Sequence, residues 1–136
     1  MRARAIEGLD LSGSLMPNVA KIVSVRLDEL RGFADAALVA DASVAQHDMR
    51  IAAKRLRYVL EIFAPCLGGE GEAARRAAKR LQSVLGDLHD CDLMLAKIGS
   101  IGSVTALLQA RRERLFHEFA DLWRSEAREG TWDALG

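Results

Sequence analysis

The sequence predicts an all-α protein that folds as an antiparallel, up-down four-helix bundle with long helices. Half of the 136 residues are hydrophobic and only two are proline, a composition typical of a small helical protein. Apolar residues recur every three to four positions over four long stretches, which is the spacing of one helix face. Short segments rich in Gly, Ser or Pro separate these stretches, and short connections favour antiparallel packing of neighbouring helices.

The four stretches begin and end at residues that suit helix ends. Pro17 fits the first turn of a helix, Pro65 marks the end of one, and Gly130 stops the last. Glu70 and Glu72 suit a first helical turn, where the helix dipole favours negative charge. We expect helices over about residues 17–39, 41–64, 70–98 and 103–129.

These helices form one helical domain, expected over residues 17–130. Residues 1–16 carry scattered charges together with Gly and Ser, and they predict a flexible N-terminal arm. Residues 131–136 form a C-terminal tail that is either loose or docked through Trp132. A chain of this length can bury one core, and nothing in it calls for a second domain.

The charge balance limits the classes of partner. The chain has 19 basic and 19 acidic residues, whereas proteins that coat nucleic acids or membranes usually present a net basic surface. The balance is uneven along the chain, because residues 47–82 contain eight Lys or Arg and four Asp or Glu, a net charge of +4. An anion-binding site is therefore expected within that window.

The two cysteines and the N-terminus predict the compartment. Cys66 and Cys91 fit apolar positions without CxxC spacing, which is typical of buried thiols in a reducing compartment. The first ten residues lack the apolar run of a signal peptide, and no apolar stretch approaches membrane-spanning length. We expect a cytoplasmic protein whose partner is neither a membrane nor, in the first instance, a nucleic acid.

One face of the predicted helix at residues 47–61 collects side chains that carry or can take up positive charge. At 100° per residue they lie within about 80° of arc, and they are His47, Arg50, Lys54 and Arg57. Tyr58 lies at the edge of this stripe, and Glu61 follows Arg57 by one turn. Neighbouring like charges repel by a few tenths of a kcal/mol per pair. A solvated helix face is the simpler interpretation of the stripe alone, and relief of the repulsion by a bound anion is the functional one.

A second basic row lies on the next predicted helix. Arg75, Lys79 and Gln82 share one face, and they lie beside the first row if the two helices pack as neighbours. Gly86 falls on the same face, although glycine costs about 1 kcal/mol relative to alanine inside a helix. It serves either close approach of the first predicted helix, a partner or a ligand, or ordinary helix packing. Asp90 is expected to hold Lys79 or an arginine, or to pack near His89.

Other chemistries receive less support from the sequence. His47, His89, Asp90 and Asp92 lack the HxxxH or ExxH spacing of helical metal sites, so we expect no metal and no cofactor. No glycine-rich phosphate loop follows a strand, and no serine lies on a strained turn, so we expect no enzyme. Three further arginines alternate with acidic residues and are expected to form a solvated face: Arg111, Arg112 and Arg114.

Two blocks of the sequence resemble the CHAD family, the "conserved histidine α-helical domain". The first block is HDMRIAAKRLRYVLEIF, in which His47, Arg50, Lys54, Leu56-Arg57-Tyr58 and Glu61 match the family pattern. The second is KRLQSVLGDLHDCDLML, in which Lys79, Leu81-Gln82, Leu85-Gly86 and Asp90 match. Together they cover about 50 residues with plausible spacing.

The resemblance implies a non-catalytic helical domain that binds inorganic polyphosphate through basic side chains. Such domains occur in bacteria and archaea, in some cases at polyphosphate granules. A typical member holds two four-helix units, whereas this chain is long enough for one and looks like the C-terminal unit. Either a homodimer rebuilds the two-unit groove, or the chain is a truncated unit with weak binding.

The resemblance and the two basic rows together predict the binding residues. The predicted contacts to polyphosphate are His47, Arg50, Lys54, Arg57, Tyr58, Arg75 and Lys79, supported by Glu61, Gln82 and Asp90. His47 adds charge when protonated, so binding should strengthen below about pH 6.5. The alternatives are a helical interaction module that docks an acidic protein, and a nucleic-acid binder.

Overall fold

The computed structural model describes residues 2–10, 12–99 and 102–135. In this part of the chain every regular element is a helix, which confirms the all-α class. The helices are α1 (Leu15–Ala37), α2 (Ser43–Ile62), α3 (Ala64–Ile98), α4 (Gly102–Glu129) and α5 (Thr131–Leu135). The four long helices agree with the predicted ones within a few residues, except at the start of α3.

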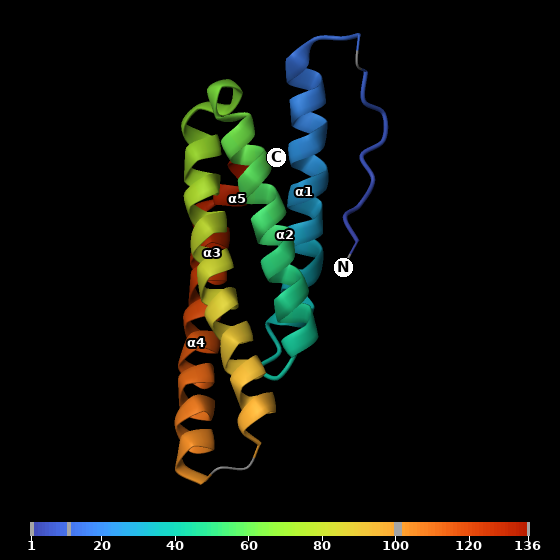
Figure 1. The fold of residues 1–136 in the computed structure, drawn as a ribbon. Helices are drawn as coiled ribbons and strands as arrows, with labels where there is room; N and C mark the ends of the chain where they lie inside the picture. The colour runs from blue at the N-terminus through green and yellow to red at the C-terminus, as the bar shows by residue number, and fades with distance from the viewer. Residues whose placement is uncertain (1, 11, 100–101, 136) are drawn as a thin grey trace.

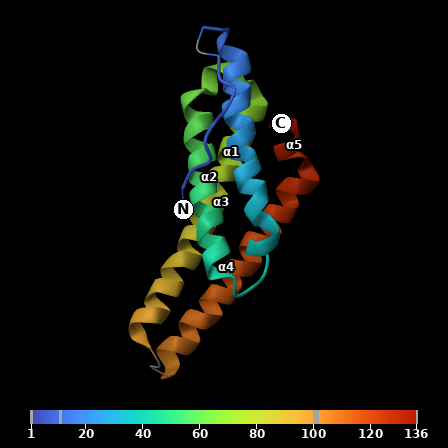
Figure 2. The same cartoon turned by 90° about the vertical axis from the view of Figure 1, so that its right-hand side faces the viewer.

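Consecutive long helices run in opposite directions, and α2 packs against α1 on one side and α3 on the other (Figure 1). The next large interface joins α3 to α4, and α5 packs on both of these helices. Contacts of this extent are not made between α1 and α4 in the described ranges, so a closed four-helix bundle is not confirmed. Figure 2 shows α3 and α4 leaning away from α1 and α2 at the end where α3 is followed by α4.

A single apolar core holds the long helices together. Each helix buries one stripe of residues, as expected for amphipathic helices around a core. The largest fully buried apolar side chains are Leu27 and Leu30 of α1, Met49, Leu56 and Leu60 of α2, Leu81, Leu85 and Leu88 of α3, and Phe119 of α4. Alanines at five further buried positions of α2 and α3 are fully covered: Ala52, Ala53, Ala74, Ala77 and Ala78. Such small side chains allow two helices to approach closely.

The start of α3 differs from the prediction because a short helical turn precedes the main helix. α3 begins at Ala64, with Pro65 in its first turn, and the helix breaks at Gly68. Gly68 has φ 64° and ψ −153°, a backbone conformation that residues with a Cβ rarely adopt. The regular part of α3 therefore begins after Gly68, close to the predicted start at Glu70. The predicted break after α3 includes Ser100, which lies outside the described residues.

Both ends of the described chain lie along the helices. The tail is docked through Trp132, which is buried and stacks on Trp123 with ring centroids 5.7 Å apart. At the other end the N-terminal arm runs beside α1 (Figure 1). The backbone N–H of Arg4 donates to the buried carboxylate of Glu29 at 3.2 Å, and Lys21 donates to the carbonyl of Gly8 at 2.7 Å.

Arg112 is not part of a solvated face, and that prediction was wrong. Its guanidinium lies in a polar cluster between α4, α3 and the α1–α2 connection, with only 15% of the side chain exposed. It donates to Asp92 at 2.5 Å, to the Gln46 side chain at 2.7 Å and to the carbonyl of Ala40 at 2.7 Å. Burial of a charge requires such partners, so Arg112 fixes α4 against the rest of the domain.

We expect Arg112→Ala to lower the free energy of unfolding by about 2–4 kcal/mol, because the partly buried Asp92 carboxylate loses its partner. Arg111→Ala is the matched control, since Arg111 is exposed and its loss should change stability by less than about 0.5 kcal/mol. Urea denaturation of both variants measures the difference. Equal stability of the two variants would show that the cluster does not hold α4 in place.

Within the described ranges, no helix combines the length and the apolar character that crossing a bilayer requires.

Candidate functional site

A polar groove runs between α2 and α3, the pair of helices with the largest interface. Its volume is about 360 Å³, and it opens broadly to solvent. The lining residues are Arg50 and Arg57 of α2 with Lys79, Gln82, Ser83, Gly86, Asp87 and Asp90 of α3. The expectation that the two basic rows lie side by side is confirmed, because cations of both helices face the same space.

Gly86 explains how Arg50 fits against α3. A Cβ placed on Gly86 would lie 3.3 Å from Nε of Arg50 and 3.9 Å from its Cδ. The absence of a side chain at this position therefore lets the Arg50 guanidinium lie across the backbone of α3. The neighbour at Gly86 is therefore a side chain of α2, which is a packing contact within the domain, and no atom of α1 lies within 4 Å of the Cβ position in the described structure.

Arg57 is held by its neighbours on α2 and, through Glu61, is linked to α3. Its Nη1 donates to Glu61 at 3.3 Å, and its guanidinium carbon lies 4.8 Å from the centroid of the Tyr58 ring. Glu61 also lies 3.8 Å from Arg75, which in turn donates two hydrogen bonds to Glu72 at 2.8 and 2.9 Å. The hydrogen bond that Arg75 donates to Glu72 raises the pKa of Arg75, so Arg75 stays charged.

Three side-chain nitrogens on the charged face of α2 are buried without a hydrogen-bond partner in the described structure. They are Nδ1 of His47, Nε of Arg50 and Nε of Arg57. Buried polar groups in proteins are almost always paired, and an unpaired one points to a missing ligand, ion or water. Guanidinium nitrogens only donate, so only an acceptor can pair with the two arginine Nε atoms. An anion in the groove would offer such acceptors.

His47 and His89 form a stacked pair at one end of the groove. Their ring centroids lie 4.1 Å apart with an angle of 22° between the ring planes. Burial lowers the pKa of His47, and the charges of His89 and Arg50 lower it further, whereas Asp48 acts in the opposite direction. In the described residues no group of three or more His, Cys, Asp and Glu side chains could hold a metal ion.

Not all predicted site residues line the groove. Arg50, Arg57, Lys79, Gln82 and Asp90 do. The predicted residues outside the lining are His47, Lys54, Tyr58, Glu61 and Arg75. Tyr58 and Glu61 contact Arg57, and Arg75 is paired with Glu72. The expected ion pair between Asp90 and Lys79 is not found among the described residues.

The structure adds residues that the sequence did not mark as site residues. Ser83 and Asp87 also line the groove, and His89 stacks on His47. Their positions one helical turn from Lys79, Gly86 or Asp90 were the available signal, because residues three or four apart share a helix face.

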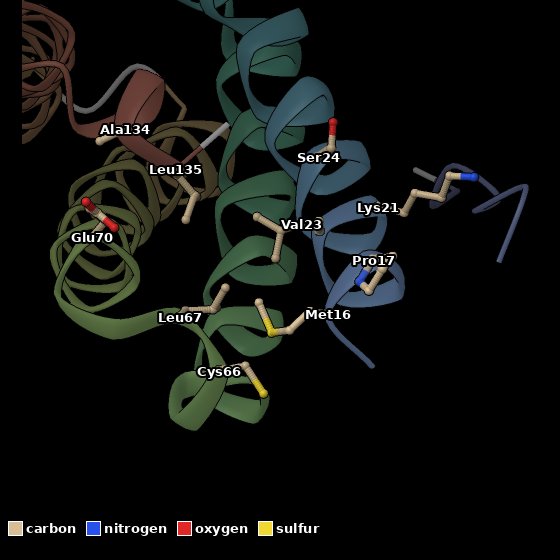
Figure 3. A pocket seen from close by; sticks show the side chains of 11 residues that line it. Met16, Pro17, Lys21, Val23, Ser24, Cys66, Leu67, Glu70, Ala134 and Leu135 are labelled. Atoms are coloured by element: carbon tan, nitrogen blue, oxygen red, sulfur yellow. The ribbon is translucent and has the colours of Figure 1, made fainter. Parts of the chain in front are cut away.

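A larger hollow lies elsewhere and suits a different chemistry. It measures about 610 Å³ and lies between α1, the start of α3 and α5 (Figure 3). Met16, Val23, Leu67 and Leu135 surround it, and Lys21 turns away toward the N-terminal arm (Figure 3). Among the described residues of its lining, Glu70 is the only other charged one. A mostly apolar hollow with one lysine suits a polyanion less well than the groove between α2 and α3.

The fold and the site define a class: a helical domain with a basic groove between two neighbouring helices. The profile of the CHAD domain family matches residues 9–98, about two thirds of the chain, and the chain belongs to the CHAD family. The match ends before α4 and covers α1 together with α2 and α3, the two helices that line the groove. Comparison with curated proteins and with solved structures found no match.

The lowered pKa of His47 predicts a pH-dependent stability. Since the unfolded chain binds the proton more readily than the folded one, the free energy of unfolding should decrease as pH falls through about 6.5. Between about pH 7.5 and 5.5, wild type should lose more stability than His47→Gln, as measured by urea denaturation. Parallel pH profiles for the two proteins would contradict the contribution of His47.

Proposed function

We propose that the α2–α3 groove binds inorganic polyphosphate and holds it without cleaving it. CHAD domains are linked in general to polyphosphate binding, and this chain belongs to that family. The observation that carries the proposal is the set of buried, unpaired nitrogens of His47, Arg50 and Arg57. A chain of phosphates supplies closely spaced, charged acceptors for such donors.

The two arginines have the larger role in the proposed mechanism. A guanidinium can grip two phosphate oxygens at once, whereas a lysine acts as a point charge. Arg57 is held by Glu61 and Tyr58, and Arg50 lies against Gly86, so both guanidinium groups border the groove. Lys79 adds charge from α3, and Lys54 and Arg75 add charge from beyond the groove lining.

The acidic residues of the groove suggest the path of the ligand. Asp87 and Asp90 lie on α3 beyond Gly86, whereas Lys79 and Arg75 lie on the other side of it. Carboxylates repel a polyanion, so most of the chain should run from Gly86 toward Lys79 and Arg75, and only one end of it should extend past Asp87 and Asp90 to His47. This mixture of charges favours a defined path over general attraction to the whole surface.

Removal of the α2 cations should weaken binding of long-chain polyphosphate. We expect Arg50/Lys54/Arg57→Ala to lower the affinity by about 100-fold or more, because charge-assisted hydrogen bonds contribute about 1.5–3 kcal/mol each. The control is Arg111/Arg114/Arg124→Ala, which removes the same charge from exposed positions of α4. Calorimetric titration at fixed ionic strength compares the variants.

An equal loss of affinity in both triple variants would mean that net charge alone attracts the ligand. Competition by RNA at matched phosphate concentration, or by an acidic protein, separates the polyphosphate proposal from its two alternatives. Release of phosphate on incubation with Mg²⁺ would contradict the non-catalytic role. The homodimer, the cytoplasmic location and the association with granules stay predictions.

Gly86→Leu should separate binding from stability. A side chain at this position displaces the Arg50 guanidinium, so we expect the affinity for polyphosphate to fall by about tenfold through loss of one charge-assisted contact. Replacement of a glycine inside a helix should leave the free energy of unfolding unchanged or raise it by up to about 1 kcal/mol. Titration and urea denaturation measure the two effects, and undiminished affinity would remove Gly86 from the proposed site.

A further inference from the structure

The stacked histidines continue the groove beyond Arg50. His47 precedes Arg50 by three residues on α2, a rise of about 4.5 Å along the helix axis. His89 follows Gly86 by three residues on α3, so one turn of each antiparallel helix leads from the Arg50–Gly86 contact to the stacked rings. The pair thus joins the two helices at the end of the groove where Asp87 and Asp90 lie.

In the free protein the surroundings of His47 favour its neutral form. His89 and Arg50 both oppose a charge on His47, and burial opposes it further, while Asp48 on α2 is the acid that favours it. Two positive charges about 4 Å apart repel strongly in a partly buried place. When one ring is protonated, the face of the other ring can stabilise its charge. Protonation of the other ring as well is opposed by the repulsion.

A polyanion bound at Arg50 changes this balance. Its phosphates neutralise the Arg50 charge and add negative charge one helical turn from the rings. A nearby opposite charge favours the charged form of a titratable group, and an imidazolium can donate a hydrogen bond to a phosphate oxygen. The buried, unpaired Nδ1 of His47 leaves this ring with an unused hydrogen-bonding atom.

We propose that the His47–His89 pair is a proton-dependent phosphate contact that takes up about one proton when polyphosphate binds the groove. This inference rests on the proposed function and adds His89 to the site. Affinity should therefore increase as pH falls, starting near the pKa of the pair in the complex. It should level off below the pKa of His47 in the free protein, which burial, His89 and Arg50 lower.

The experiment measures the affinity of the full chain for long-chain polyphosphate between about pH 5.5 and 8 at fixed ionic strength. Linkage of one proton gives a change of up to about tenfold in affinity per pH unit. Calorimetry in two buffers of different ionisation enthalpy counts the protons taken up, with one expected at most. Interior phosphates are strong acids, so the ligand contributes little to the profile.

Three variants test the role of the pair. His47→Asn/His89→Asn should bind with an affinity nearly independent of pH, whereas His117→Asn, at an exposed position of α4, should keep the wild-type profile. His89→Phe keeps a ring against His47 but removes the second charge. The affinity of His89→Phe should therefore still depend on pH, but with its midpoint at higher pH, because the charge of His89 no longer lowers the pKa of His47. Far-ultraviolet circular dichroism at each pH confirms that the variants are folded.

The results separate the two levels of the proposal. Tight, salt-dependent binding that does not vary with pH, or a pH profile that survives in the double variant, would overturn the proton-linked contact and leave polyphosphate binding intact. Failure of wild type to bind at every pH would overturn the proposed function itself.

Discussion

The contact between Arg50 and Gly86 is the interaction on which the groove depends. It requires α2 and α3 to lie close together, and the fully buried alanines of both helices allow that approach. A bulkier core between the helices would widen the groove, and a side chain at position 86 would fill it. Small residues therefore matter on both sides of these helices: alanines in the apolar core, and Gly86 in the polar groove.

The groove concentrates positive charge at a cost to the free protein. Neighbouring cations on α2 repel, the arginine Nε atoms lack acceptors, and the pKa of His47 is lowered. Glu61 and Tyr58 offset part of this cost at Arg57, while the described structure provides no equivalent partner for Arg50. A bound polyanion would relieve all three penalties together, which is why the proposed function and the proton-linked histidines follow from one arrangement.

The sequence predicted the parts of the fold that depend on local periodicity. The helix bounds and the charged face of α2 follow from apolar spacing, and the CHAD motifs pointed to the same face. Particular side-chain contacts between helices could not be predicted from the sequence. The burial of Arg112 depends on where α4 meets the α1–α2 connection, and the stacking of His47 on His89 depends on the register of α2 against α3. Lys54 shares the stripe but not the groove lining, because neighbouring positions on one helix face can meet different surroundings.

Nuclear magnetic resonance of the arginine side chains addresses the groove atom by atom. In protein labelled with ¹⁵N at the arginine Nε, long-chain polyphosphate should shift the signals of Arg50 and Arg57 and slow their exchange with water, because these two donors gain acceptors. The signals of Arg111 and Arg114 on the exposed face of α4 should change little. Binding that leaves Arg50 and Arg57 unaffected, or shifts all arginines alike, would show that the polyanion does not occupy the α2–α3 groove.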